Sequence, residues 1–328
     1  VAIGHQSMKT LDGSVHDNNI AIGAYAMDNP GTTGGHNNIF MGYDAGGGTW
    51  STAVSNYNIG IGNYVMDGAL NGAINNTAVG HQALGALTSG YSNVAVGYGT
   101  GDGVTTGNHN VVMGYNAGTA MTGTTNTVLI GSSAGSAINS TDANGTVAVG
   151  HSAGAAITSG QENVALGFMA AYTLTTGDYN IAIGNKSLET HLTGLRNIAI
   201  GNNAMSDTNA GTTAQDSDGG AWANTKSEYN VGIGNYVMDA VMDAAGYNTA
   251  LGHQALGALT TGDGNTIIGN AAGDAITGGS DNTAAGRFAL GAEVSGQRSV
   301  AIGNSALGSQ VLGAAWSYNT AVGWGAGS

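Results

Sequence analysis

Histidine is the residue type in this sequence best suited to metal binding or proton transfer, because imidazole ligates metal ions and titrates near neutral pH. Four of the eight histidines, His5, His81, His151 and His253, directly follow a glycine in the same short sequence pattern. They lie at least four copies of that pattern apart. The ligands of one metal ion must meet in space, so this spacing favours ordinary surface or turn residues. No metal site is predicted.

Acidic residues offer a second candidate chemistry, since carboxylate oxygens are ligands for calcium. Asp216, Asp218 and Glu228 lie in one polar stretch, but their spacing fits no EF-hand loop, and the Gly-Gly-x-Gly-x-Asp repeat is absent from the sequence. A solvated acidic loop is the favoured interpretation. Asp216 and Asp218 are retained as candidate binding residues.

Catalytic and cofactor-binding motifs are weak throughout. The glycine run at Gly97, Gly99, Gly101 and Gly103 follows a predicted strand without opening a helix, so it does not fit a phosphate-binding loop. Serines such as Ser89 lie in repeated turns and not in a nucleophile elbow. We expect no catalytic residue, no cofactor and no enzymatic activity, because repetition makes positions alike whereas catalysis needs a few unlike residues together.

Composition points to a turn-rich β protein. The 328 residues include 59 glycines and 1 proline, with 41% hydrophobic and 8% charged residues. So much glycine disfavours helices, and so much hydrophobic content disfavours disorder. Cysteine is absent, which excludes disulfides, and a net charge of −14 leaves no basic stripe for nucleic acid. No apolar run is long enough for membrane insertion by this segment.

A repeated unit organises the chain. The stretch NTAVGHQALGALTSG at 76–90 returns as NTALGHQALGALTTG at 248–262. Its cassette is Asn, a β-branched residue, Ala, a large aliphatic residue and Gly. A period most often of 17 residues predicts an all-β parallel β-solenoid of about eighteen turns. The residues chosen to represent the structural repeat are Asn76, Gly80, Asn93, Gly97, Asn180, Gly184, Asn197, Gly201, Asn248 and Gly252.

Each cassette predicts a short strand with two different faces. The large residues, such as Val94 and Val96, are two positions apart and therefore share one face. We expect that face to fill the interior, and the opposite face of Ala and Gly to allow close approach of another backbone layer or chain. The final Gly permits a sharp turn.

The rest of each repeat predicts a return path. A second aliphatic residue follows the Gly by seven positions, as at Leu87 and Val104, and is expected to begin a second short strand. A turn rich in Thr and Gly then leads to the next Asn, which tolerates left-handed backbone angles and can stack into an amide ladder. Thr127, Thr146 and Ser299 replace Asn but keep a hydrogen-bonding side chain.

A longer period of 172 residues is superimposed on the short one. GNYVMD at 62–67 matches 234–239, and Trp50 and Trp222 are also 172 apart. Duplication of a block of about ten turns explains both. We predict one continuous solenoid over 1–328, with residues 206–229 as an inserted loop.

Aromatic residues between cassettes are the best candidates for binding, because large apolar groups on loops often mark binding surfaces. Trp50, Trp222 and Trp316 lie in the longest such segments, and Tyr57, Tyr229 and Tyr318 precede a cassette Asn. The alternative is that these rings fold back over the edge of a turn.

The cassettes NIAIG at 180–184 and 197–201, VAIG at 300–303 and NTAVG at 319–323 resemble the head repeats of YadA-like trimeric autotransporter adhesins. They are also similar to repeats in bacteriophage tail fibres. The resemblance covers nearly the whole chain. It implies a left-handed parallel β-roll, a homotrimer and an adhesive surface role.

We therefore expect a non-enzymatic extracellular fibre segment, the shaft or head of a cell-surface adhesin or virion tail fibre, whose partner is a cell-surface or host receptor. The alternative is a structural filament subunit that polymerises end to end with neighbouring subunits. An ice-binding solenoid is disfavoured because no regular Thr-x-Thr array lines one face.

Overall fold

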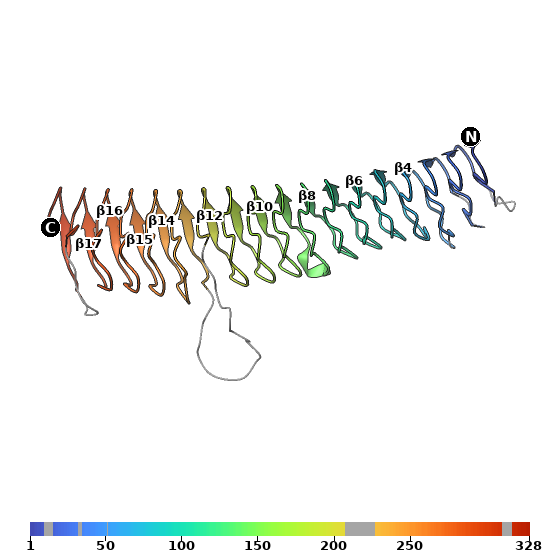
Figure 1. The fold of residues 1–328 in the computed structure, drawn as a ribbon. Coiled ribbons are helices and arrows are strands. Elements are labelled where there is room, and N and C mark those ends of the chain that lie inside the picture. Colours follow the sequence, from blue (N-terminus) through green and yellow to red (C-terminus); the bar gives the residue numbers. More distant parts are fainter. Residues whose placement is uncertain (10–15, 32–34, 51, 207–226, 310–316) are drawn as a thin grey trace. The chain divides into compact units, whose positions relative to one another are not determined.

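The computed structural model describes residues 1–9, 16–31, 35–50, 52–206, 227–309 and 317–328. They form two compact units, Val1–Glu162 and Asn163–Ser328. Within each unit the described chain is a parallel β-solenoid with one three-residue strand per turn, except that the first strand has two residues (Figure 1). The all-β class and solenoid architecture predicted from the repeat are confirmed.

Consecutive strands of the first unit pair in parallel and in register, so that Ala78 lies beside Ala95 and Val79 beside Val96. One 3-10 helix, η1 (Thr141–Ala143), interrupts a turn. The strands are β1 (Ala2–Ile3), β2 (Ile20–Ile22), β3 (Ile39–Met41), β4 (Ile59–Ile61), β5 (Thr77–Val79), β6 (Val94–Val96), β7 (Val111–Met113), β8 (Val128–Ile130) and β9 (Val147–Val149).

The second unit repeats this arrangement, and Ala182 lies beside Ala199 in the same register. Its strands are β10 (Val164–Leu166), β11 (Ile181–Ile183), β12 (Ile198–Ile200), β13 (Val231–Ile233), β14 (Thr249–Leu251), β15 (Thr266–Ile268), β16 (Thr283–Ala285), β17 (Val300–Ile302) and β18 (Thr320–Val322). No helix among the described residues is long and apolar enough to cross a membrane.

The strand faces are the reverse of the prediction. The middle residue of each three-residue strand points inward, and Ala78 and Ala95 are fully buried. The large flanking residues point outward, as at Ile61, which is 40% exposed. Small residues occupy the inner face because the aliphatic side chains of the opposite wall, including Leu87, already fill the interior of a narrow coil.

Phe40 shows how little room the interior has. This ring is the middle residue of β3 and is fully buried. A Cβ at Gly60, the middle position of β4, would lie 2.6 Å from the ring, and a Cβ at Gly46 would lie 2.8 Å from it. One large inward side chain thus requires glycine at two neighbouring positions.

The predicted second strand is not formed. Leu87, Val104 and the equivalent aliphatics are buried as expected, but the chain there runs through tight turns. Leu87 N–H donates to the carbonyl of Leu84 within its own turn. The next residue, Thr88, donates to Thr105 in the following turn, so bonding between turns continues without a strand.

The asparagine ladder is confirmed. The Oδ1 atom of Asn76 accepts hydrogen bonds from the backbone N–H and the Nδ2 of Asn93, both at 3.0 Å. Its own Nδ2 donates to Gly90 O at 2.8 Å. Each such amide is buried, so the ladder satisfies polar groups that water does not reach. Thr127 continues it, since its hydroxyl donates to Asn110 Oδ1 at 2.8 Å.

The left-handed backbone angle predicted for the ladder Asn falls on the residue before it. Asn75 has φ of 61° and Ser92 has 57°, whereas Asn76 and Asn93 are not among the positive-φ residues. Gln82 and Leu84, after the cassette Gly, are also left-handed, at 56° and 52°. These conformations are costly for residues other than glycine, so turn-to-turn hydrogen bonding must hold them.

Both the backbone conformation and the lack of space require glycine at the end of a cassette. Gly80 has φ of 137°, and a Cβ there would lie 2.1 Å from the carbonyl oxygen of Gly97 in the next turn. The predicted turn role is therefore confirmed. The close approach at Gly80 is made by the neighbouring turn of the same unit.

Candidate functional site

The first candidate site is the outward aliphatic face, which we define as the first and third residues of the strands. In the first unit this face is almost wholly aliphatic, with Thr77 as the exception among the three-residue strands. Met41, Ile61 and Met113 are 37%, 40% and 37% exposed. A contiguous exposed apolar surface of this kind marks an association surface more often than isolated apolar residues do.

In the second unit the outward aliphatic face becomes partly polar. Thr249, Thr266 and Thr283 occupy the first position of three consecutive strands and lie side by side. The third position stays aliphatic at Leu251 and Ile268, which are 45% and 43% exposed. The two units therefore present related faces of different polarity.

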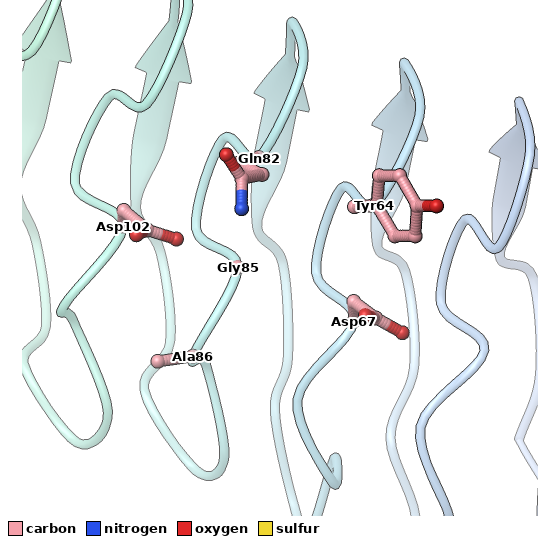
Figure 2. Close-up of a pocket in the computed structure, with 6 residues that line it drawn as sticks. All are labelled: Tyr64, Asp67, Gln82, Gly85, Ala86 and Asp102. Carbon is pink, nitrogen blue, oxygen red and sulfur yellow. The ribbon is translucent and has the colours of Figure 1, made fainter.

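The second candidate site is a hollow of about 250 Å³ on the turns that follow β4, β5 and β6 (Figure 2). We call it the first pocket. One phenol ring, two carboxyl groups and one side-chain amide give it both a π surface and hydrogen-bond acceptors. Its lining residues are Tyr64, Asp67, Gln82, Gly85, Ala86 and Asp102.

The two carboxyl groups of the first pocket differ in their surroundings. Asp102 extends toward Gly85 of the adjacent turn (Figure 2), where a Cβ would lie within 2.3 Å of its Oδ1 atom. Burial raises the pKa of Asp102, although the charge of His81 opposes this. The absence of a side chain at Gly85 therefore makes the space that Asp102 enters.

Asp67 lies below the Tyr64 ring, with its carboxyl group turned away from Gln82 (Figure 2). Burial, followed by the charges of Asp44 and Asp28, raises the pKa of Asp67 to about 6. The carboxylates on this side of the solenoid therefore repel one another at neutral pH.

A second pocket of about 230 Å³ lies in the second unit. It is lined by Tyr236, Asp239, Gln254, Gly257, Ala258 and Asp274, each 172 residues after its counterpart. Its third turn has diverged: Tyr98, Gly99 and Thr100 correspond to Asn270, Ala271 and Ala272, while Asp102 corresponds to Asp274. Burial raises the pKa of Asp274 as well.

A row of exposed rings borders the first pocket. Tyr64 contacts Tyr43 with ring centroids 5.4 Å apart, and His81 stacks on Tyr98 at 5.0 Å. The row occupies seven consecutive turns, one ring in each. Its members are His5, Tyr25, Tyr43, Tyr64, His81, Tyr98 and Tyr115.

The residues selected from the sequence as binding candidates meet different outcomes. Trp50 is only 3% exposed, packs on Phe40 and donates to Gly46 O at 3.0 Å, so it folds back into the core and is not a surface residue. Asp216, Asp218, Trp222 and Trp316 lie outside the described residues. Tyr57 and Tyr318 are exposed, at 56% and 61%.

Sequence reasoning missed the pockets, although a signal for them is present. Counting five residues from each cassette Gly gives Asp67, Gly85 and Asp102 on successive turns, and Asp239, Gly257 and Asp274 in the second copy. The order Asp, Gly, Asp thus occurs at the same position of three successive turns, once in each unit.

Within the described ranges, no group of three or more His, Asp or Glu side chains is arranged to hold a metal ion. No model of a known protein family matches this sequence, and no curated protein matches it.

Proposed function

We propose that this protein is a non-enzymatic fibre segment whose copies associate side by side through the outward aliphatic face. One observation carries the proposal: the large residues of the strands lie on the solvent side of the solenoid, where the described residues of their own unit leave them partly exposed. Burying such side chains against another copy is favourable by about 25 cal/mol per Å² of apolar surface.

The size of the outward aliphatic face supports this association. Nine strands stacked about 4.8 Å apart, each about 10 Å long, give each unit a face on the order of 400 Å². Each unit therefore offers about half of the 800 Å² per partner that a standard stable interface uses. The number of copies that we propose, three, comes from the resemblance of the cassettes to YadA-like head repeats.

The same resemblance supports an extracellular role as the shaft or head of an adhesin or virion tail fibre, with receptor contacts made by residues between cassettes. Tyr57, Tyr229 and Tyr318 are exposed at such positions, at 56%, 37% and 61%. Aromatic rings held on a rigid scaffold are suited to recognition.

Cross-linking tests the side-by-side association. The chain has no cysteine, so a single one placed at Ile61 on the outward face reports on that face alone. With a short bis-maleimide linker we expect covalent dimers of the Ile61→Cys protein at micromolar concentration. Asp142→Cys, at an exposed position on η1, is the matched control and should give few.

Equal cross-linking at both positions, or none at Ile61, contradicts the proposal. Assemblies that keep growing with protein concentration favour the end-to-end filament instead. Lys at Ile3 and Val322, which are 58% and 67% exposed in the terminal strands β1 and β18, should then stop growth.

A further inference from the structure

We propose that the first pocket binds the guanidinium group of an arginine side chain on a partner protein, with Asp102 as its carboxylate, and that the second pocket does the same with Asp274. The inference does not depend on the side-by-side association proposed above. It rests on charge, on the chemistry of the pocket lining and on how this chain places its own arginines.

The charge of the first unit is uncompensated. Residues 1–162 contain eight Asp and Glu but a single Lys or Arg, Lys9, and no Lys or Arg occurs between Lys9 and Lys186. The carboxyl groups of the first pocket therefore have no Lys or Arg partner on their own or neighbouring turns. A buried carboxylate without a cation is unfavourable, which makes the pocket complementary to a cation from outside.

The second unit shows what this chain does with an arginine near an acid and a tyrosine. Arg298 Nε lies 3.4 Å from Asp281 Oδ2, and its Nη1 donates to the Tyr318 hydroxyl at 3.1 Å. Its Cζ lies 5.8 Å from the Tyr318 ring centroid. Acid and ring come from turns on either side of the arginine.

A second example places an arginine between two rings. Arg196 Cζ lies 5.1 Å and 5.6 Å from the ring centroids of Tyr179 and Tyr229, one on each side. An arginine on one turn thus fits between rings of the turns before and after it. The first pocket has a ring and an acid on the turns before and after that of Gln82, but no arginine.

The lining of the first pocket matches guanidinium better than a compact cation. Guanidinium is planar, stacks on aromatic rings and donates hydrogen bonds along its edges. Tyr64 offers the ring, and Asp102 offers a carboxylate beside the open backbone at Gly85. A metal ion would need more ligands at short range, and no such set exists among the described residues.

The second pocket has the same types of lining residue, but one of its carboxyl groups already has a hydrogen-bond donor. Asp239 there accepts a hydrogen bond of 2.5 Å from the Ser206 hydroxyl. Its counterpart Asp67 is repelled by Asp44 and Asp28. We therefore expect the first pocket to bind more tightly than the second.

Calorimetric titration of the full chain tests the proposal at physiological ionic strength. The probes are a short blocked peptide with one central arginine and matched peptides with lysine or citrulline, the last a neutral analogue of arginine. We expect two sites per chain for the arginine peptide, at least tenfold weaker binding for lysine and no binding for citrulline. Free methylguanidine, binding more weakly at the same two sites, separates the group from its peptide.

Variants locate the sites. Asp102→Asn should remove the tighter site and Asp274→Asn the weaker one, each with at least a tenfold loss of affinity. Asp142→Asn, which removes the same charge from η1 of the first unit, should change affinity less than twofold. Circular dichroism of each variant establishes that it folds.

Equal binding of the arginine and citrulline peptides overturns the proposal. Unchanged binding in the chain that carries both Asp102→Asn and Asp274→Asn also overturns it. So does a loss of affinity in Asp142→Asn as large as that in Asp102→Asn, because it indicates attraction to net charge alone. Competition by millimolar calcium at constant ionic strength, with the peptide displaced, assigns the pockets to a metal ion and also overturns it.

Discussion

The two units share a frame but differ on their surfaces. The cassette glycines, the asparagine ladder and the residues lining the two pockets recur at an offset of 172 residues. The outward aliphatic face does not recur unchanged, because Thr249, Thr266 and Thr283 make it partly polar in the second unit. Ser206 on Asp239 likewise has no match on Asp67. Backbone stacking thus fixes the interior, while the exterior has diverged.

Equivalent substitutions of the repeated backbone positions should lower stability equally in the two units. The largest effect is expected at a cassette glycine. Gly80→Ala and Gly252→Ala each introduce a Cβ at a φ near 140°, 2.1 Å and 2.4 Å from a carbonyl oxygen of the next turn. We expect a loss of about 3 kcal/mol or more in unfolding free energy for either. Gly246→Ala, where the nearest atom is 3.4 Å away, is the control.

Denaturant unfolding monitored by circular dichroism measures these losses. If Gly80→Ala or Gly252→Ala lowers the unfolding free energy less than Gly246→Ala does, the claim that both units stack their turns in the same way is contradicted. Unequal costs at Gly80 and Gly252 contradict it as well.

The second-largest loss of stability is expected for substitutions in the asparagine ladder. Asn93→Ala removes the acceptor for Asn110 N–H and Nδ2 and the donor to Gly107 O, all buried. Asn265→Ala does the same to Asn282 and Gly279. We expect each to cost about 2–4 kcal/mol in unfolding free energy, because the partners remain buried and unsatisfied.

Thr105→Ala, which removes one exposed hydroxyl bond to Thr122 O, should cost well under 1 kcal/mol. Amide hydrogen exchange shows where stability is lost. Protection from exchange should decrease in the two turns beside each altered Asn. Protection lost throughout a unit would show that the ladder is not a local support.

The smallest effect distinguishes the two units. The raised pKa of Asp67 means that the folded chain binds a proton more tightly than the unfolded chain, so this group's contribution to stability is greatest below pH 4 and is lost as pH rises through about 6. Asp67→Asn should therefore stabilise the chain at pH 7 by about 1 kcal/mol or less, given its exposure, and by nothing at pH 4.

Asp239→Asn is the contrast, because the Ser206 hydroxyl already stabilises that carboxylate; it should bring no gain at pH 7. Thermal unfolding at both pH values measures the two variants together with the parent chain. A gain at Asp239 equal to that at Asp67, or a gain at Asp67 that persists at pH 4, would contradict the role given to Asp28 and Asp44.

The repeat period predicted strand positions, register and the amide ladder, because all three follow from one motif recurring at a nearly fixed interval. It failed on which face is interior, since alternation shows only that Val94 and Val96 share a face and not where that face points. The left-handed backbone of Leu84 could not be predicted, because it contradicts the local preference of a bulky residue and is held by a hydrogen bond to the next turn. The pockets were not predicted because their lining comes from three turns, whose side chains are brought together only by the fold.

The solution mass of the full chain is the most direct test of the central claim, that the outward aliphatic face joins copies of this chain. Light scattering at micromolar concentration should give three times the 32.2 kDa chain mass. Lys at Ile61, Val96 and Met113 together should reduce it to a single chain without loss of strand signal, and Lys at the exposed Tyr57, Tyr91 and Tyr115 should not. A monomeric parent chain, or a trimer that survives the first set of substitutions, would contradict the claim.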